Sequence, residues 1–162
     1  MYEAMLWLEG SALAEGLRGL GVWSYGIINL LHILGIGTLF GAVLILDLRL
    51  LGAWNSITVA TIARPTVPLA ACGFFVAVCS GVSMFSINAT EYHGNPFFYI
   101  KLPTLLAALI NIGIVTRVEA WRRAVLGADT RPGDQRILAL VGAISLFLWL
   151  VVLSCGRMIG YW

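Results

Sequence analysis

Four long apolar stretches dominate this sequence and decide what the chain can fold into. They run over residues 22–46, 67–87, 98–118 and 137–158. Each is long enough to cross the hydrocarbon core of a bilayer, which takes about 20 residues. Backbone polar groups in lipid must find partners within the protein, so we expect each stretch to be an α-helix. The sequence therefore predicts an all-α integral membrane protein, a bundle of four transmembrane helices in up-down order.

The composition excludes several other classes of protein. Of the 162 residues, 60% are hydrophobic and 11% are charged, whereas a soluble domain carries about 25% charged residues. An ordinary cytosolic enzyme, a disordered chain and a nucleic-acid binder are therefore excluded. We expect a single membrane domain over residues 1–162, with the lipid bilayer as its first partner and no nucleic acid.

Residues 2–20 have a different character from the four stretches. Glu3, Glu9, Glu15 and Arg18 interrupt a series of leucine and methionine residues. The segment is too charged to span a membrane, and it lacks the basic start of a signal peptide. We expect one amphipathic helix that lies at the membrane interface and precedes the bundle.

The basic residues predict the orientation of the chain in the membrane. The connections on one side hold seven of them: Arg49, Arg64, Arg117, Arg122, Arg123, Arg131 and Arg136. Connections rich in lysine and arginine stay in the cytoplasm. The sequence thus predicts a multi-pass protein of the bacterial inner (cytoplasmic) membrane, with both termini on the outer, periplasmic side.

His32 is the first candidate for a functional residue. It lies about ten residues into the first span, roughly 14 Å along the helix at 1.5 Å per residue, and Tyr25 and Asn29 share its face. An ionisable residue this deep in a membrane is a functional candidate by default. The alternative is a neutral histidine that forms a hydrogen bond with a facing helix.

A haem site at the outer side follows from this position. Neutral imidazoles are suitable axial ligands of haem iron, so His32 is the predicted ligand, with His93 or Met84 as the second. His93 lies in the outer loop 88–96, and its alternative is a solvated loop residue.

Two cations at the outer side fit the same haem hypothesis. Lys101 and Arg157 could neutralise haem propionates there. The alternative for Lys101 is a side chain that reaches the lipid headgroups.

Sulfur-containing residues leave a copper site open. Cys72, Cys79 and Cys155, with Met84 and His32, offer soft ligands of the kind that Cu(I) prefers. Cysteine is equally common as a small buried residue, and the chain has no Cys-x-x-Cys pair.

Gly37 and Gly41 form a Gly-x-x-x-Gly motif in the first span. Such a motif marks a close contact between helices, either within a bundle or in a homodimer.

Two segments carry a resemblance to known proteins. The stretch from His32-Ile-Leu-Gly35 to Asp47-Leu-Arg-Leu-Leu-Gly52, and later Tyr92-His-Gly-Asn-Pro96-Phe-Phe-Tyr-Ile-Lys101, resemble an uncharacterised family of small bacterial four-span membrane proteins. The resemblance covers most of the chain.

A more distant similarity is to the copper-resistance D-like proteins and the HemJ-type protoporphyrinogen oxidase. The pattern that carries it is His32, Gly41, Arg49 and Lys101. In the HemJ-type proteins the histidine and the lysine are the functional pair, and haem b is bound. The resemblance therefore implies haem b here, and more remotely the oxidation of a porphyrinogen.

Three functions remain open at this point. The first is a haem b membrane protein that passes electrons between a quinol or another redox partner and an acceptor, or oxidises a small substrate. The second is a non-catalytic membrane subunit or assembly factor, and the third is a copper-handling membrane protein. Whether the protein is an enzyme is also left open.

Overall fold

The computed structural model describes residues 2–128 and 131–162. Over these residues the chain forms seven α-helices, two short 3-10 helices and no strand. Four of the described helices are long and apolar enough to cross a membrane: α3 (Val22–Leu50), α4 (Val59–Ile87), α5 (Pro96–Val115) and α7 (Asp134–Met158). The predicted all-α membrane bundle is confirmed.

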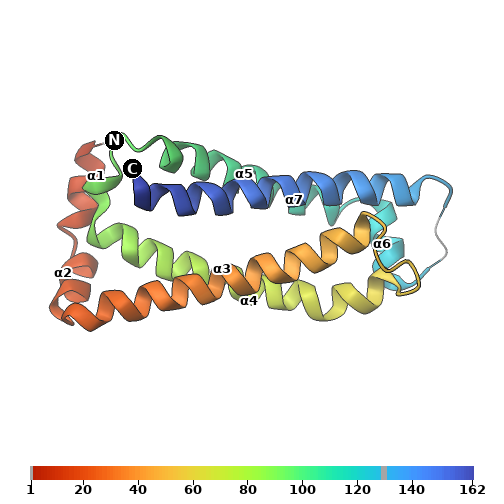
Figure 1. Cartoon of the computed structure of the whole chain (residues 1–162), viewed down its shortest axis with the longest axis horizontal. Helices are drawn as coiled ribbons and strands as arrows, with labels where there is room; N and C mark the ends of the chain where they lie inside the picture. Colours follow the sequence, from red (N-terminus) through yellow and green to blue (C-terminus); the bar gives the residue numbers. More distant parts are fainter. Residues whose placement is uncertain (1, 129–130) are drawn as a thin grey trace.

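The four long helices form two antiparallel pairs (Figure 1). α3 packs along α4 and α5 packs along α7, and α3 and α7 join the two pairs. Both termini lie at one end, with the short helices α1 (Tyr2–Glu9) and α2 (Ala12–Gly19). We call this the N-terminal end, and the opposite end, where α6 (Glu119–Leu126) lies, the α6 end.

The helix α4 begins at Val59, eight residues before the start predicted for the second span. Thr58 caps it, since its hydroxyl accepts a hydrogen bond from the amide of Thr61 at 3.2 Å. Pro65 and Pro68 both lie inside the helix. Neighbouring helices can compensate for the amide bonds that a proline removes from a membrane helix. The prolines therefore do not mark its start.

The N-terminal segment forms two helices, and the prediction of one helix over residues 2–20 is wrong in this respect. α1 ends at Glu9, and Ser11 caps α2 by accepting a hydrogen bond from the amide of Ala14 at 3.3 Å. The hydroxyl of a serine stabilises a helix start, and Gly10 before it is costly inside a helix. The two short helices lie across the N-terminal end of the bundle (Figure 1).

Glu9 and Arg18 tie these helices to the bundle. The carboxylate of Glu9 accepts hydrogen bonds from the amide and the hydroxyl of Thr90, at 2.9 and 2.7 Å. Arg18 donates to the carbonyl of Ile87 at 3.0 Å. The bonds from Thr90, backbone first, hold the pKa of Glu9 below its ordinary value of 4.5.

The hydrogen bonds between Glu9 and Thr90 predict that α1 and α2 detach from the bundle at acidic pH. A carboxyl with a lowered folded-state pKa stabilises the fold fully above its ordinary pKa, and that contribution is lost as the pH falls through the folded value. We expect proteolysis in the Gly10–Ser11 linker to accelerate as the pH drops below about 4.5. Glu9→Gln should remove this pH dependence. An unchanged dependence in Glu9→Gln would contradict the role of the carboxylate.

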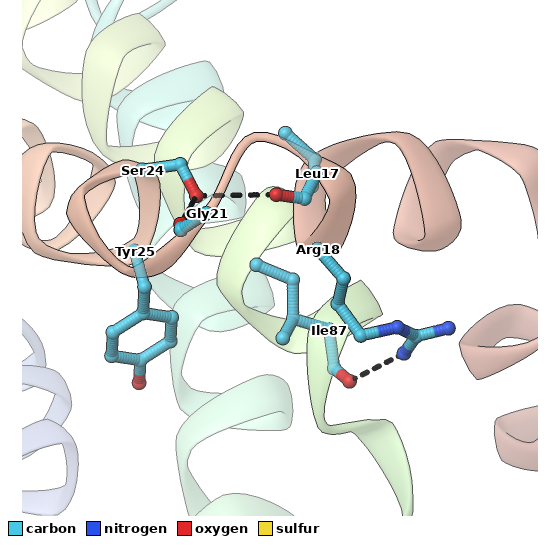
Figure 2. Close-up of a pocket in the computed structure, with 6 residues that line it drawn as sticks. All are labelled: Leu17, Arg18, Gly21, Ser24, Tyr25 and Ile87. Carbon is cyan, nitrogen blue, oxygen red and sulfur yellow. Dashed lines mark hydrogen bonds between the residues drawn. The ribbon is translucent and has the colours of Figure 1, made fainter.

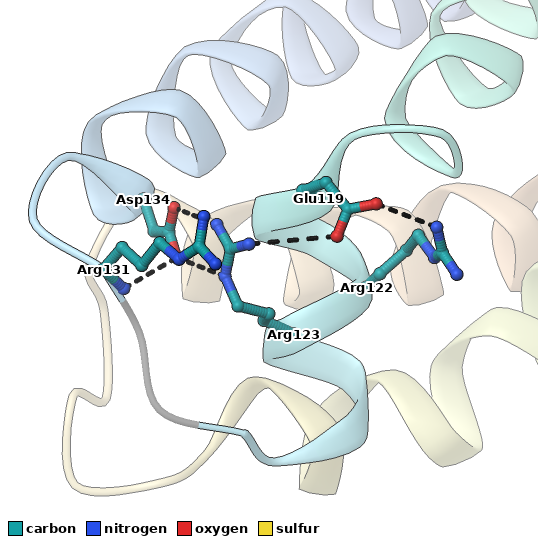
Figure 3. Close-up of polar contacts among 5 residues, drawn as sticks. All are labelled: Glu119, Arg122, Arg123, Arg131 and Asp134. Atoms are coloured by element: carbon teal, nitrogen blue, oxygen red, sulfur yellow. Dashed lines mark hydrogen bonds and ion pairs between the residues drawn. The ribbon is translucent and has the colours of Figure 1, made fainter.

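Ion pairs and an apolar cluster close the α6 end. Arg123 holds Asp134 through two hydrogen bonds of 3.0 and 2.7 Å, and the amide of Arg131 donates to the same carboxylate at 2.9 Å (Figure 3). Arg122 pairs with Glu119 at 2.8 Å. Beneath them lies an apolar cluster that we call the end cluster: Leu50, Val59, Ala120, Ala124 and Leu138.

The closest approach of two helices is at Gly35 of α3 and Gly73 of α4. A Cβ atom added to Gly35 would lie 2.7 Å from the amide nitrogen of Ala77, and one added to Gly73 would lie 2.6 Å from that of Leu39. At Gly37 and Gly41 no described atom lies within 4 Å of such a Cβ. The motif predicted to mark a close contact therefore makes none within the described chain.

A second apolar cluster fills the middle of the bundle; its buried members come from three spans, and Ala70 and Phe74 of α4 pack against them. We call it the central cluster, and its buried members are Leu39, Val43, Ala108 and Trp149. It separates the two halves in which polar side chains lie.

Candidate functional site

His32 of α3 faces α4 in the N-terminal half of the bundle. Its Nδ1 lies 2.9 Å from the carbonyl oxygen of Ala77 and 3.1 Å from the hydroxyl of Ser80. A carbonyl oxygen only accepts hydrogen bonds, so Nδ1 carries the proton and donates it. The neutral ring therefore has its lone pair on Nε2. Histidines that bind a metal are almost always oriented by such a bond from the other ring nitrogen.

Two small residues of α4 hold the imidazole in place. The hydroxyl of Ser80 donates to the carbonyl of Val76 at 2.6 Å, which fixes it beside Nδ1. A Cβ added to Gly81 would lie 2.9 Å from Cε1 of His32. The ring thus packs directly on the backbone of α4, where only glycine leaves room for it.

Lys101 of α5 provides a cation in the same half. It is half-buried, it lies within electrostatic range of His32, and its Nζ would lie 3.4 Å from a Cβ added to Gly156 of α7. Cys155 is also its neighbour. Among the described residues, the three ion pairs leave Lys101 without a carboxylate.

Each of the four spans thus contributes one polar side chain to this half. We call the set the N-terminal polar layer: His32, Ser80, Lys101 and Cys155.

Three aromatic rings pack together between this layer and the N-terminal end. Phe85, Tyr92 and Phe98 lie with ring centroids 5.2–5.4 Å apart. Tyr92 belongs to the 3-10 helix η1 (Ala89–Tyr92). Burial raises its pKa above the ordinary 10.0, and Tyr25 and Glu91 raise it further. The Tyr92 phenol is therefore neutral at any physiological pH.

An open pocket of about 320 Å³ lies where α2 meets α3 and the end of α4 (Figure 2). Its walls are Leu17, Arg18, Gly21, Ser24, Tyr25 and Ile87. Tyr25 precedes His32 by seven residues, about 10 Å along the helix. Asn29, half-buried, lies between them on α3. The predicted residues Tyr25 and Asn29 thus lie along α3 between the pocket and the histidine.

The structure does not bring His93 to His32. His93 is exposed, and its ring meets that of Tyr2 edge to face at 5.2 Å. The helix from Ala77, which binds His32, to Ile87 already covers about 15 Å, and His93 follows beyond it. Met84 lies one turn from Ser80 on α4 and is the nearer of the two predicted second ligands.

Arg157 also lies apart from the N-terminal polar layer. It is exposed, its guanidinium lies 4.4 Å from the ring centroid of Tyr161, and it donates to the hydroxyl of that residue. Of the two cations predicted for propionates, the structure places only Lys101 near His32.

The cysteines do not gather. Cys72 and Cys79 are exposed on α4, whereas Cys155 is buried on α7. Within residues 2–128 and 131–162, no three histidine, cysteine, aspartate or glutamate side chains form a group that could hold a metal ion. The geometry therefore gives the copper hypothesis no ligand cluster.

Sequence reasoning missed three residues of this site, namely Ser80, Gly81 and Tyr92. Serine and glycine are common in membrane helices, so neither stands out. Ser80 and Gly81 are neighbours of His32 because α3 packs against α4. The spacing of residues within either helix does not predict this packing.

Fold and site together define the class of protein: a small integral membrane protein of four spans, with an oriented histidine inside one half. The chain belongs to the Family of unknown function (DUF6644), whose model matches residues 4–162. This confirms the resemblance to an uncharacterised family. Neither the curated proteins nor the solved structures contain a match to the chain.

Proposed function

We propose that this protein binds haem b in the N-terminal half of the bundle, with Nε2 of His32 as axial ligand, and serves electron transfer or redox chemistry. The observation that carries the proposal is the hydrogen bond from Nδ1 of His32 to Ala77, which leaves Nε2 as the free donor atom. The same hydrogen bond and the contact with Gly81 hold the ring in one orientation.

The surrounding residues fit the other parts of a haem. The ammonium group of Lys101 has no carboxylate partner among the described residues and suits a propionate. The rings of Phe85, Tyr92 and Phe98 offer apolar aromatic surface for a porphyrin. When bound, haem iron supplies one-electron chemistry. The resemblance to the HemJ-type proteins was inferred from His32, Gly41, Arg49 and Lys101, a pattern that includes the same histidine and lysine, and no match to a curated protein supports it.

Of the two histidines in the chain, only His32 is placed to bind the haem iron. His93 lies too far away, so the second axial position is left to Met84, to a small exogenous ligand or to none. A haem iron with an accessible position reacts with external ligands, whereas one with two protein ligands mainly transfers electrons. The number of protein ligands on the haem iron thus distinguishes electron transfer from reaction with a small substrate.

We propose the pocket shown in Figure 2 as the place where a redox partner would bind. A quinol headgroup there would meet the guanidinium of Arg18 and the hydroxyl of Tyr25, about 10 Å along α3 from His32. Pockets of about 300 Å³ and more are typical of small-molecule sites. We include a quinol among the partners on this ground.

The orientation in the membrane is part of the proposal. The seven arginines of the inner connections all lie toward the α6 end, so this end faces the cytoplasm of a bacterial inner membrane. The N-terminal polar layer and both termini then lie on the periplasmic side. The open face at Gly37 and Gly41 is where a homodimer would form.

An optical spectrum of the detergent-purified protein, before and after dithionite, tests the proposed function. We expect a Soret band that sharpens on reduction together with α and β bands. Addition of carbon monoxide should shift the Soret band if the second axial position is open, and leave it unchanged if Met84 occupies that position. A spectrum without these bands, even after haem is supplied during expression, would overturn the proposal. Metal analysis would then test copper, and co-purification would test a subunit or assembly factor.

A further inference from the structure

A second layer of polar residues lies between the central cluster and the end cluster. One helical turn from the central cluster toward the α6 end, each spanning helix carries one buried polar side chain. These residues, the inner polar layer, are Asp47 of α3, Thr66 of α4, Asn111 of α5 and Ser145 of α7. The N-terminal polar layer and its haem proposal do not involve them.

Asp47 is the unusual member of this layer. Its side chain belongs to a residue only 3% exposed, and its Oδ2 has no hydrogen-bond partner among the described residues. The hydroxyl of Ser145 is its polar neighbour, and Gly142 packs against its backbone oxygen. None of the ion pairs within the described chain includes it.

None of the charged groups around this position forms an ion pair with Asp47 among the described residues. Arg49, on the same helix, donates from Nε to the carbonyl of Ile57 at 2.6 Å, and its Nη1 lacks a described partner. Arg123 and Asp134, from α6 and α7, bind each other. From α4 and α5 the facing residues are Thr66 and Asn111, which do not titrate. The surroundings of Asp47 therefore contain no neutralising cation in contact with it.

An ionised carboxylate in this position would be buried without a partner, which is among the costliest arrangements in a protein. A neutral carboxylic acid avoids that cost, and its O–H group can serve as a donor. Membrane-embedded carboxyl groups of this kind commonly act as proton sites.

We propose that Asp47 is a proton-binding site that exchanges with water at the α6 end. The carboxylate takes a proton from hydronium, which becomes water, and the reverse step returns it. His32 lies 15 residues earlier on α3, about 22 Å away, and the central cluster of Leu39, Val43, Ala108 and Trp149 fills the space between. Exchange toward the N-terminal end is therefore blocked. Toward the α6 end, α3 ends at Leu50, three residues or about 4.5 Å beyond Asp47.

Infrared spectroscopy of the full-length protein in lipid nanodiscs tests this site. We expect a carboxylic-acid C=O band at neutral pH that shifts in D₂O and is absent from Asp47→Asn. Glu119→Gln is the matched control, because Glu119 is exposed and paired with Arg122, and it should leave the band unchanged. A wild-type spectrum without the band, or a band that persists in Asp47→Asn, would overturn the proposal.

Two further measurements test the proposal even if Asp47→Asn fails to fold. Aspartate labelled with ¹³C in the wild-type protein should shift the band, which assigns it to an aspartic acid without any substitution. Asp47→Asn should keep the melting temperature, because an amide has nearly the shape of a neutral carboxylic acid. A large fall would mark an ionised Asp47 that pairs with Arg49, against the proposal. A failure of haem binding leaves all these outcomes unaffected.

Discussion

Alanine at Gly35 is expected to weaken the bundle strongly, whereas alanine at Gly37 should leave it stable. The added Cβ at Gly35 would lie 2.7 Å from the backbone nitrogen of Ala77 and 3.0 Å from the carbonyl oxygen of Gly73. Both are backbone atoms, so the clash is relieved only if α3 and α4 separate. Overpacking of a core costs about 1–3 kcal/mol, and we expect the upper part of this range here.

Gly37 is a matched control for this prediction. It lies two residues further along the same helix, and no described atom lies within 4 Å of its added Cβ. Both substitutions bring the same gain in helix propensity, roughly 1 kcal/mol. Thermal denaturation of the purified proteins in one detergent compares them. Equal melting temperatures for the two variants would show that the close approach of α3 and α4 is not as described.

The loss of haem from His32→Ala is the second large effect that we expect. If Nε2 of His32 is the only protein nitrogen on the iron, its removal should weaken haem binding by more than about 100-fold, since even loss of an outer hydrogen bond to a metal ligand costs 10–100-fold. His93→Ala should bind haem like the wild type, because His93 lies against Tyr2 at the end of the bundle. Haem titration followed by the Soret absorbance measures both affinities.

A folding defect can be separated from the loss of the ligand. Exogenous imidazole should restore the Soret band to His32→Ala by filling the space of the missing ring, which an unfolded protein cannot do. Size-exclusion chromatography should show the same monodisperse peak for both variants. Retention of haem by His32→Ala with loss from His93→Ala would reverse the assignment of the ligand.

The sequence alone was sufficient for the architecture and for His32. Lipid cannot satisfy backbone polar groups, so four apolar stretches of sufficient length must be helices, and their number places both termini at one end. His32 stands out because a bilayer interior makes any ionisable side chain exceptional. Neither conclusion needs knowledge of which helices touch.

Helix boundaries at the interface were harder to predict. The second span was predicted to begin at residue 67, yet α4 begins at Val59 and passes through Pro65 and Pro68. α6 was not expected, since it is only eight residues long, three of them charged, and its stability comes from Ala120 and Ala124 of the end cluster. Local sequence carries little information where tertiary packing decides.

The partners of the polar residues were decided by the tertiary structure. Gly37 and Gly41 carry the recognisable motif, but Gly35 and Gly73 make the contact, because the rotation of α3 about its axis depends on all its neighbours. The same rotation turns His32 toward Ala77. His93 packs instead on Tyr2 of α1. The rotation of α3 also buries Asp47 without a cation. The sequence determined that four helices cross a membrane and that one of them carries a deep histidine, because these follow from hydrophobicity along the chain. Only the packing of the helices determined which side chains meet, because such contacts join residues that are far apart in the sequence.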